Sequence, residues 1–284
     1  MFKQITIIAP GLLGGSLGMA VKKRKIARRV VVWARRIENA QAAVRRKAAD
    51  RYEVDLSDAV KGSDLVVLCC PVEAMSSLAR QFRDSLGRDT IVTDVGSVKY
   101  DVVTQVSHMI GKHAAFIGSH PMAGSDRSGL GAASAGLFKD SVCLVTPTSG
   151  VSRAKLHKLI RFWQAVGCRI ATLSPSEHDE AVARISHLPH LVSAALVTLA
   201  GKKGSALFNY TGPGFRDMTR LAGGPPEMWS EICMSNHAEI RRAMDELIEE
   251  LEALRRAAAN KSAVEIRAYL RRARNLRQEL KNRS

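Results

Sequence analysis

The sequence predicts an α/β domain with a largely parallel sheet, followed by an all-helical domain. Up to about residue 173, short apolar runs alternate with amphipathic helical patterns, and from Glu177 onward no strand pattern appears. Strand, helix and strand in repetition favour a parallel sheet with helices on both faces. We therefore expect the first domain to span residues 1–173 and the second to span residues 174–284.

Each expected element follows from a local pattern of residues. Short runs rich in β-branched and aliphatic residues are the expected strands, at Ile5–Ala9, Val30–Ala34, Leu65–Cys70, Thr90–Val95, Ala115–Gly118, Val142–Thr146 and Arg169–Leu173. Amphipathic segments between them are the expected helices of the first domain, at Leu13–Lys23, Glu73–Phe82, Lys99–Ile110 and Arg153–Val166. In the second domain we expect helices at Ser176–Leu199, Pro226–Ala259 and Ser262–Leu280.

Two signals mark borders in the second domain. Ser174 or Ser176 is the expected cap of its first helix, because acidic residues follow within one turn. The stretch 209–217 carries glycines and a proline, so we expect a loop or a broken helix there.

The net charge of +16 is concentrated in two stretches, residues 22–47 and residues 255–277. Strongly basic chains often bind nucleic acid. This chain has no zinc-finger spacing, no helix-turn-helix with a basic reading helix and no aromatic–basic platform for RNA. We therefore expect no nucleic-acid partner and assign the charge to solvated helix faces that attract small anions. A nonenzymatic nucleic-acid-binding protein is the alternative from a different functional class.

The cysteines and the apolar runs indicate the compartment. Five cysteines, an odd number without C-x-x-C spacing, are typical of a reducing environment. The N-terminus has no charged leader with a long apolar core, and we expect no apolar run of membrane-spanning length. We expect a cytoplasmic protein with no membrane partner.

The stretch IIAPGLLGGS, residues 7–16, joins the first expected strand to the first expected helix and has most of the pattern G-x-G-x-x-G. In a Rossmann-type fold, the pyrophosphate of a dinucleotide sits on the N-terminus of this helix. Gly11 would let the backbone approach the phosphates, and Gly14 would let the helix pack on the strand. Ala9 replaces the first glycine, and its methyl group is tolerable if φ stays negative. We interpret the stretch as a working variant of the phosphate-binding turn.

The choice between NAD and NADP depends on the end of the second strand. About 20 residues beyond the glycines, NAD enzymes carry a carboxylate for the ribose hydroxyls, whereas an arginine accommodates the 2′-phosphate of NADP. Here the chain reads Ala34-Arg35-Arg36, without an acid. We expect NADP, with NAD as the alternative if the arginines are only exposed loop charges. The full expected cofactor site comprises Ala9, Gly11, Leu12, Leu13, Gly14, Ala34, Arg35, Arg36, Pro71, Val72 and Ser97.

Further motifs are more specific than a nucleotide-binding turn. They are DVGSVK (residues 94–99), GSHPMAGSDRSG (residues 118–129), and the pair ISHLPH (residues 185–190) and GFRDMTRLA (residues 214–222), followed by Met228-Trp229. With these motifs in this order, the chain resembles the prephenate/arogenate dehydrogenase family of tyrosine biosynthesis over nearly its whole length. The resemblance implies a Rossmann-type nucleotide-binding domain followed by an all-helical dimerisation domain.

Members of that family oxidise the C4 hydroxyl of prephenate or arogenate by hydride transfer to a nicotinamide, and loss of CO2 then gives the aromatic product. This reaction needs a base for the hydroxyl proton and a cation for a carboxylate. The resemblance assigns the catalytic roles to His120, as the base, and to Ser97, which orients the hydroxyl and the nicotinamide. It assigns the substrate site to Ser125, Asp126, Ser186, His190, Arg216, Arg220 and Trp229.

Several of these side chains also have structural interpretations. These are a helix N-cap for Ser97, a core position for Trp229, and helix salt bridges with Asp217 or Glu227 for Arg216 and Arg220. His187 and His190 lie three residues apart without a third ligand at suitable spacing, so we expect no metal. The resemblance leaves His187 with a structural role. The preference between prephenate and arogenate stays open. Another NADP-linked dehydrogenase, of the β-hydroxyacid dehydrogenase or imine reductase type, is the alternative among enzymes.

The expected partners are a small anionic substrate and a second copy of the chain. Apolar residues recur at helical spacing in the C-terminal part, at Ile240, Met244, Leu247, Leu251 and Leu254. We expect a homodimer through these C-terminal helices, which is also where the family dimerises.

Overall fold

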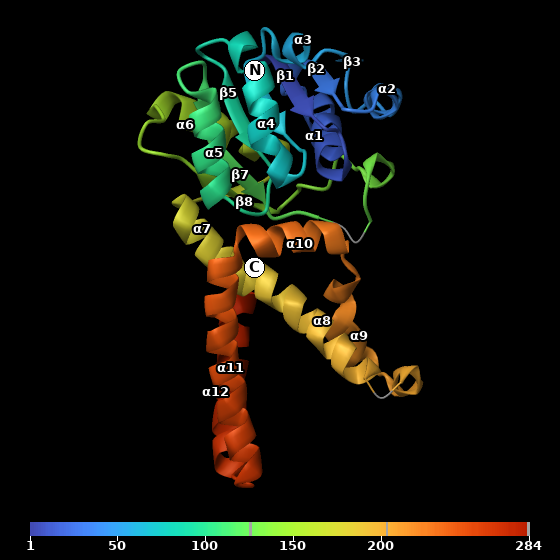
Figure 1. Cartoon of the computed structure of the whole chain (residues 1–284), viewed down its shortest axis with the longest axis vertical. Helices are drawn as coiled ribbons and strands as arrows, with labels where there is room; N and C mark the ends of the chain where they lie inside the picture. The colour runs from blue at the N-terminus through green and yellow to red at the C-terminus, as the bar shows by residue number, and fades with distance from the viewer. Residues whose placement is uncertain (125–126, 203, 283–284) are drawn as a thin grey trace. The chain divides into compact units, whose positions relative to one another are not determined.

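The structure, a computed structural model, describes residues 1–124, 127–202 and 204–282, and its N-terminal part is built on a six-stranded parallel sheet (Figure 1). The strands are β1 (Phe2–Ile8), β2 (Ala27–Trp33), β3 (Arg51–Tyr52), β4 (Leu65–Leu68), β5 (Ile91–Asp94) and β6 (Ala115–Phe116). Their order is β3-β2-β1-β4-β5-β6, and each neighbouring pair is parallel. This is the strand order of a Rossmann-type fold, so the predicted fold class is confirmed.

Helices cover both faces of this sheet. They are α1 (Leu12–Lys23), α2 (Ile37–Arg45), α3 (Leu56–Val60), α4 (Val72–Phe82) and α5 (Tyr100–Ile110). In β4, Leu65 and Val67 join one buried core and Val66 and Leu68 join the other, because successive side chains of a strand point to opposite faces. The short elements α2, α3 and β3 were not predicted, because each carries too few apolar residues to set a period.

A second sheet contains β7 (Gly118–Pro121), β8 (Val142–Thr146) and β9 (Arg169–Thr172), with α6 (Arg153–Val166) between the last two strands. β7 is antiparallel to β8, and β8 is parallel to β9. The predicted single strand Ala115–Gly118 is therefore wrong, because the chain leaves the first sheet after Phe116 and enters the second at Gly118. A Cβ atom on Gly118 would lie 2.3 Å from Thr146 Oγ1, so the crossing requires a glycine.

One long helical run follows, made of α7 (Pro175–Val182), a π-helical turn (Ala183–His187) and α8 (Leu188–Gly201). Ser174 caps it, and the Ser174 hydroxyl and the Glu177 carboxylate form a capping box. The helix predicted at Ser176–Leu199 is therefore not a uniform α-helix, because the wider π-helical turn interrupts it. Pro189 explains this, because it lacks the N–H that would bond the carbonyl four residues earlier.

The run Pro175–Gly201 is long and apolar enough to cross a membrane by length and composition alone, with a mean hydropathy of 1.3. The expectation that no run reaches this length is therefore wrong. The same run carries His178, Asp179 and His187, all buried inside the protein. Such groups are costly in a bilayer, and a single apolar helix is weak evidence for a membrane span because the core helix of a soluble protein passes the same test.

Further helices of this first compact unit, Met1–Asn236, are α9 (Pro213–Thr219) and α10 (Pro226–Ser235), with 3-10 turns at Ser205–Tyr210 and Arg220–Gly223. The stretch 209–217 contains the end of one 3-10 turn and the start of α9. The prediction of a loop or broken helix there is confirmed.

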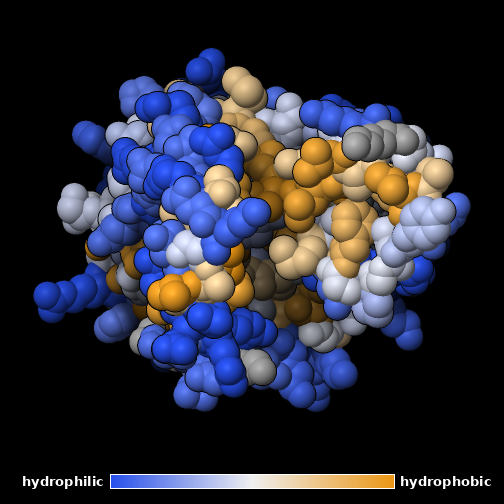
Figure 2. Space-filling view, turned by 90° about the horizontal axis from the view of Figure 1, so that it is seen from below, coloured by the Kyte–Doolittle hydropathy of each residue, from blue (hydrophilic) through white to orange (hydrophobic). Residues whose placement is uncertain are grey.

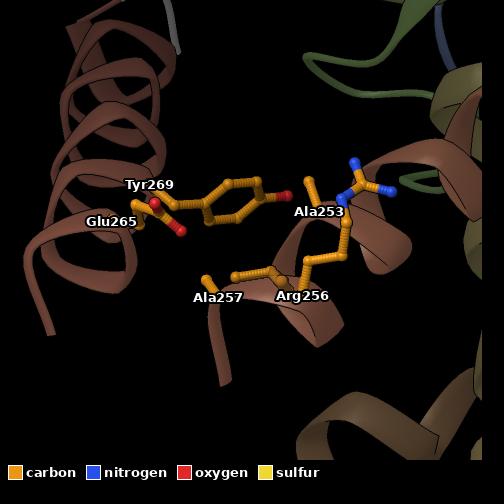
Figure 3. A pocket seen from close by; sticks show the side chains of 6 residues that line it. Ala253, Arg256, Ala257, Glu265 and Tyr269 are labelled. Atoms are coloured by element: carbon orange, nitrogen blue, oxygen red, sulfur yellow. The ribbon is translucent and has the colours of Figure 1, made fainter. Parts of the chain in front are cut away.

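A second compact unit, His237–Ser284, contains the helical hairpin of α11 (His237–Ala259) and α12 (Ala263–Asn282). The predicted single helix Pro226–Ala259 is wrong, because Asn236 ends α10 and turns its side chain into buried hydrogen bonds. Between α11 and α12 lies a pocket of about 280 Å³, into which Tyr269 reaches from α12 (Figure 3). Its lining residues are Ala253, Leu254, Arg256, Ala257, Glu265 and Tyr269.

Candidate active site

The carboxyl ends of β2, β1, β4 and β5 lie side by side at one edge of the parallel sheet. Ligands of open α/β sheets bind at this edge, where the strand order reverses. The expected cofactor residues follow directly from these strand ends: Ala9 to Gly14 after β1, Ala34 to Arg36 after β2, Pro71 and Val72 after β4, and Ser97 after β5. The fold thus brings all four segments of the expected cofactor site to a common edge.

The turn after β1 has the shape of a phosphate-binding loop. Gly11 is the N-cap of α1, and no described atom lies within 4 Å of the place where its Cβ would be. A Cβ on Gly14 would lie 2.9 Å from the Ala9 carbonyl oxygen and 3.0 Å from Cys69 Cβ, so this glycine lets α1 pack on the strands. Ala9 has a φ of +63°, so the condition of a negative φ, under which its methyl group would be tolerable, is not met. An alanine in this left-handed conformation costs roughly 1–2 kcal/mol relative to the right-handed one.

Arg35 and Arg36 follow β2 and are exposed. Arg36 is the N-cap residue of α2 and makes no side-chain cap. Within the described part of the chain, neither guanidinium forms an ion pair or a side-chain hydrogen bond. Both cations are therefore free to meet an anion at this edge of the sheet.

A buried ion pair shapes the loop that carries Ser97. Lys99 Nζ lies 2.5 Å from Asp94 Oδ2, and both side chains are fully buried. Asp94 also accepts hydrogen bonds from the backbone N–H groups of Gly96 and Ser119, at 2.9 Å each. These bonds tie the end of β5 to the start of β7, which carries His120. Ser97 is half-buried in the loop between β5 and α5, and the N-cap residue of α5 is Lys99, so Ser97 is not the helix cap.

His120 lies on β7 and is only 7 % exposed. Burial, reinforced by the neighbouring His178, Lys99 and His187, lowers the pKa of His120 well below 6.5. The imidazole is therefore neutral near pH 7, which leaves one ring nitrogen as a hydrogen-bond acceptor. A neutral histidine with a small exposed edge can take a proton from a bound hydroxyl group.

His120 is linked to a pair of residues that the sequence did not reveal as part of the site. His120 Nδ1 lies 2.9 Å from His178 Nε2, and His178 Nδ1 lies 2.7 Å from Asp179 Oδ1. Both partners come from the first turn and a half of α7, where the acids of SPSEHDE indicated only a helix start. The burial of these two side chains depends on tertiary packing, which the local sequence does not indicate.

The helical side of the site is built on α8 and α10. His190 of α8 and Trp229 of α10 stack with ring centroids 3.5 Å apart. His190 is buried and Trp229 half-buried, and burial lowers the pKa of His190. Ser186 lies half-buried in the π-helical turn. His187 has a different environment, because it is fully buried and its Nδ1 accepts a hydrogen bond from Asn236 at 3.2 Å.

Arg220 begins the 3-10 turn that packs on α8, where the Ala222 N–H donates to Ser193 Oγ. This turn ends beside the stacked rings, because a Cβ on Gly224 would lie 2.5 Å from Trp229 Nε1. Arg216 is on α9. Both guanidinium groups are exposed and, among the described residues, neither forms the helix salt bridge that the sequence allowed.

Two expected substrate residues and the expected absence of a metal site are still to be compared with the structure. Ser125 and Asp126 lie outside the described residues. Within residues 1–124, 127–202 and 204–282, no group of three or more His, Cys, Asp or Glu side chains could hold a metal ion.

Comparison with known proteins assigns the chain to a family. The model of the prephenate dehydrogenase nucleotide-binding domain matches residues 17–172, and the model of the prephenate dehydrogenase dimerization domain matches residues 174–272. The chain belongs to the prephenate dehydrogenase family. It is thus an NAD(P)-dependent dehydrogenase, and its family supports a homodimer.

Individual relatives agree with this assignment. A cyclohexadienyl dehydrogenase of Zymomonas mobilis is 32% identical over 92% of this chain and 90% of its own length. A prephenate dehydrogenase of A. aeolicus, solved with hydroxyphenyl propionate and NAD+, has a TM-score of 0.91, 28% identity and 99% coverage of both chains. An arogenate dehydrogenase of Synechocystis has a TM-score of 0.86 at 29% identity, covering 98% of this chain and 99% of its own. The family assignment favours a prephenate or arogenate dehydrogenase over a β-hydroxyacid dehydrogenase, an imine reductase or a nonenzymatic nucleic-acid-binding protein.

Proposed function

We propose that this prephenate dehydrogenase family enzyme oxidises the ring C4 hydroxyl of prephenate or arogenate, with His120 as the base. The observation that carries the proposal is the buried imidazole of His120, whose Nδ1 lies 2.9 Å from His178 Nε2. A bound nicotinamide dinucleotide would accept the C4 hydrogen as hydride. His120 would take the hydroxyl proton, so that C4 becomes a ketone.

The second stage is decarboxylation. The C1–carboxylate bond breaks, CO2 leaves, and the bonding electron pair moves through the ring to the ketone oxygen. That oxygen then needs one proton to become a phenol, and the imidazolium of His120 supplies the proton it took. His120 therefore ends the cycle neutral. Ser97 would hold the hydroxyl oxygen during the first stage.

The substrate's carboxylate groups need cationic partners. Arg220 is our first candidate, because its guanidinium is exposed and has no ion-pair partner among the described residues. The residue also begins the 3-10 turn that ends at the His190–Trp229 stack. Arg216 is the second candidate, on the preceding helix. We propose that Ser186, His190 and Trp229 line the same substrate site.

We infer that the cofactor is NADP in preference to NAD. The open space at Gly11 and the first N–H groups of α1, at Leu12 and Leu13, suit the pyrophosphate. Arg35 and Arg36 suit a 2′-phosphate, because guanidinium groups bind phosphate oxygens in pairs. The A. aeolicus relative was solved with NAD+, so the preference must be measured on this chain.

We also infer a cytoplasmic enzyme that dimerises through its C-terminal helices, with a domain boundary between residues 173 and 174, where the two family models meet. All five cysteines are free thiols, which suits a reducing compartment. On α11, Met244 and Leu251 are exposed, and Leu254 lines the pocket of Figure 3. Apolar side chains also gather in a broad area of the face in Figure 2. Sedimentation at micromolar concentration should give a dimer, and a monomer alone would contradict this inference.

The function is tested by initial rates with prephenate and with arogenate, each with NAD and with NADP. We expect turnover of at least one substrate with one CO2 released per reduced cofactor. Absence of turnover with both substrates would contradict the proposal, as would reduced cofactor formed without CO2.

A further inference from the structure

The expected base is the end of a buried chain of three side chains. His120 on β7 contacts His178 on α7, with ring centroids 5.1 Å apart, and His178 contacts Asp179. His178 is fully buried and Asp179 is 4 % exposed, so water does not compete for these hydrogen bonds. The chain leads from the small exposed edge of His120 into the interior of the protein.

Asp179 is fixed at the inner end of this chain. Its Oδ1 accepts from the backbone N–H of Lys99 at 2.7 Å, and its Oδ2 accepts from the backbone N–H of Tyr100 at 2.8 Å. These N–H groups are at the N-terminus of α5, where the helix dipole favours a negative charge. Backbone amides can only donate, so both carboxylate oxygens act as acceptors.

The position of each ring proton follows from this anchor. A carboxylate that can only accept requires His178 Nδ1 to carry a proton. In a neutral His178, Nε2 is then a bare acceptor, so the nitrogen facing it, His120 Nδ1, must be the donor. A neutral His120 with its proton on Nδ1 has a bare Nε2. Burial lowers the pKa of both imidazoles, which keeps them neutral at pH 7.

We propose that His178 and Asp179 are positioning residues that hold His120 in the tautomer whose Nε2 is free to accept the substrate's hydroxyl proton. The inference rests on the proposed role of His120 as the base. We call the hydrogen-bonded chain of His120, His178 and Asp179 the relay. Without the relay, a neutral imidazole of His120 can carry its proton on Nε2, and Nε2 then cannot accept a proton. The relay also stabilises the positive charge that forms when His120 is protonated, because the carboxylate of Asp179 lies two hydrogen bonds away.

The other ionisable groups around the relay do not replace Asp179. Lys99 and Asp94 are paired with each other. His187 has a pKa lowered to about 4 and accepts from Asn236, so it is neutral at pH 7. Asp179 is therefore the carboxylate that sets the direction of the two histidine hydrogen bonds.

Two substitutions of His178 separate positioning from packing. In His178→Gln, the amide oxygen can still accept from His120 Nδ1, whereas His178→Phe fills the space and provides no acceptor. We expect His178→Phe to lower kcat by about 10–100-fold, the usual cost of losing a supporting hydrogen-bond partner, with KM and cofactor affinity unchanged. His178→Gln should keep most of kcat, although phenylalanine is the closer match in ring shape. Equal kcat values for the two variants would overturn the proposal.

The tautomer is measured directly by NMR of 15N-histidine-labelled enzyme, with the His120→Asn variant identifying the His120 signals. We expect Nδ1–H and a bare Nε2 in the wild-type enzyme. In His178→Phe, which provides no acceptor for His120 Nδ1, the Nδ1–H form of His120 should lose its preference, whereas Glu180→Gln, on the exposed carboxylate next to Asp179, should leave the wild-type tautomer unchanged. A wild-type His120 with its proton on Nε2 would overturn the relay.

The two proposals fail in different ways. If His120→Asn retains turnover while the wild-type NMR signals show the expected tautomer, the role of His120 as base is wrong and the relay stands. If His120→Asn is inactive but the wild-type tautomer is reversed, the relay is wrong and the base stands. Should His178→Phe fail to fold, the wild-type spectrum still decides the question.

Discussion

The imidazole of His190 lies flat on the indole of Trp229, with ring centroids 3.5 Å apart and planes 9° apart. His190 comes from α8 and Trp229 from α10, so the stack joins two helices that are distant in the sequence. Gly224 makes the approach possible, since a Cβ there would lie 2.9 Å from His190 Cε1. Aromatic stacking of this kind contributes about 0.5–1.5 kcal/mol beyond the buried area.

Trp229→Ala should raise KM for the substrate by up to about tenfold, because His190 loses the surface that orients it. Trp229→Phe keeps an aromatic face and should restore most of the affinity. Steady-state kinetics with both variants, alongside Tyr210→Ala as an exposed aromatic control, measure the effect. A fall in thermal stability with an unchanged KM would assign Trp229 to the core alone.

Arg35→Ala and Arg36→Ala should each reduce the preference for NADP over NAD. Each removes one or more charged hydrogen bonds to the 2′-phosphate, worth roughly 1.5–3 kcal/mol, which is at least an order of magnitude in kcat/KM. High salt should weaken the same preference.

The matched control for the cofactor prediction is Arg29→Ala, which changes an exposed arginine on β2, the strand that Arg35 and Arg36 follow, away from its carboxyl end. It should leave the ratio of kcat/KM values for NADP and NAD unchanged. A wild-type enzyme that favours NAD would show that Arg35 and Arg36 are only solvated charges.

Arg220→Ala should act mainly on substrate affinity, because it removes one partner of a charge-assisted pair. The expected loss of about 2–3 kcal/mol corresponds to a rise in KM of roughly 30–150-fold. Arg216→Ala, the same change on the neighbouring helix, should have a smaller effect. If KM is unchanged in Arg220→Ala and raised in Arg216→Ala, the two assignments must be exchanged.

Acid should destabilise the enzyme through its buried histidines. Burial lowers the pKa of His187 from 6.5 to about 4. Between these values the unfolded chain binds a proton that the folded chain does not, so stability is lost as the pH falls from 6.5 to about 4 and is unaffected above 6.5. For His187 alone the loss is about 3 kcal/mol at pH 4.

Denaturant unfolding at pH 7 and pH 4 measures this linkage. In His187→Asn, whose amide oxygen can still accept from Asn236, the difference in unfolding free energy between the two pH values should shrink. His157→Asn, at an exposed position, should leave the difference as in the wild type. An equal difference in all three proteins would show that His187 does not couple to acid unfolding.

The strongly periodic elements of the fold could be predicted from the sequence. β4 reads as an unbroken apolar run because it is buried on both faces, and α6 has matching apolar spacing and a clear cap at Ser152. The break after Phe116 could not be predicted, because which sheet a strand joins depends on residues such as Thr146 that are far along the chain. The positive φ of Ala9 is likewise set by the turn between β1 and α1 and not by alanine's own preference.

The candidate site divides in the same way. The positions of His120, Ser97 and Arg220 followed from the family resemblance, because their motifs are local in sequence. His178 and Asp179 were missed, because an acidic helix start usually indicates exposed capping residues, and here the same residues turn inward to His120 and to the N-terminus of α5. The buried hydrogen bonds of Asn236 could not be predicted either, because they join it to Asp179 and His187, some 50 residues away in the chain.

The central claim is that His120 takes the hydroxyl proton, and the most direct measurement is kcat of His120→Asn with the preferred substrate and cofactor at saturation. Loss of a general base should lower kcat by roughly 10²–10⁴-fold. Cofactor affinity, measured by fluorescence titration of the same protein, should be nearly unchanged, because His120 does not belong to the expected cofactor site. A near-normal kcat in a folded His120→Asn enzyme would contradict the account.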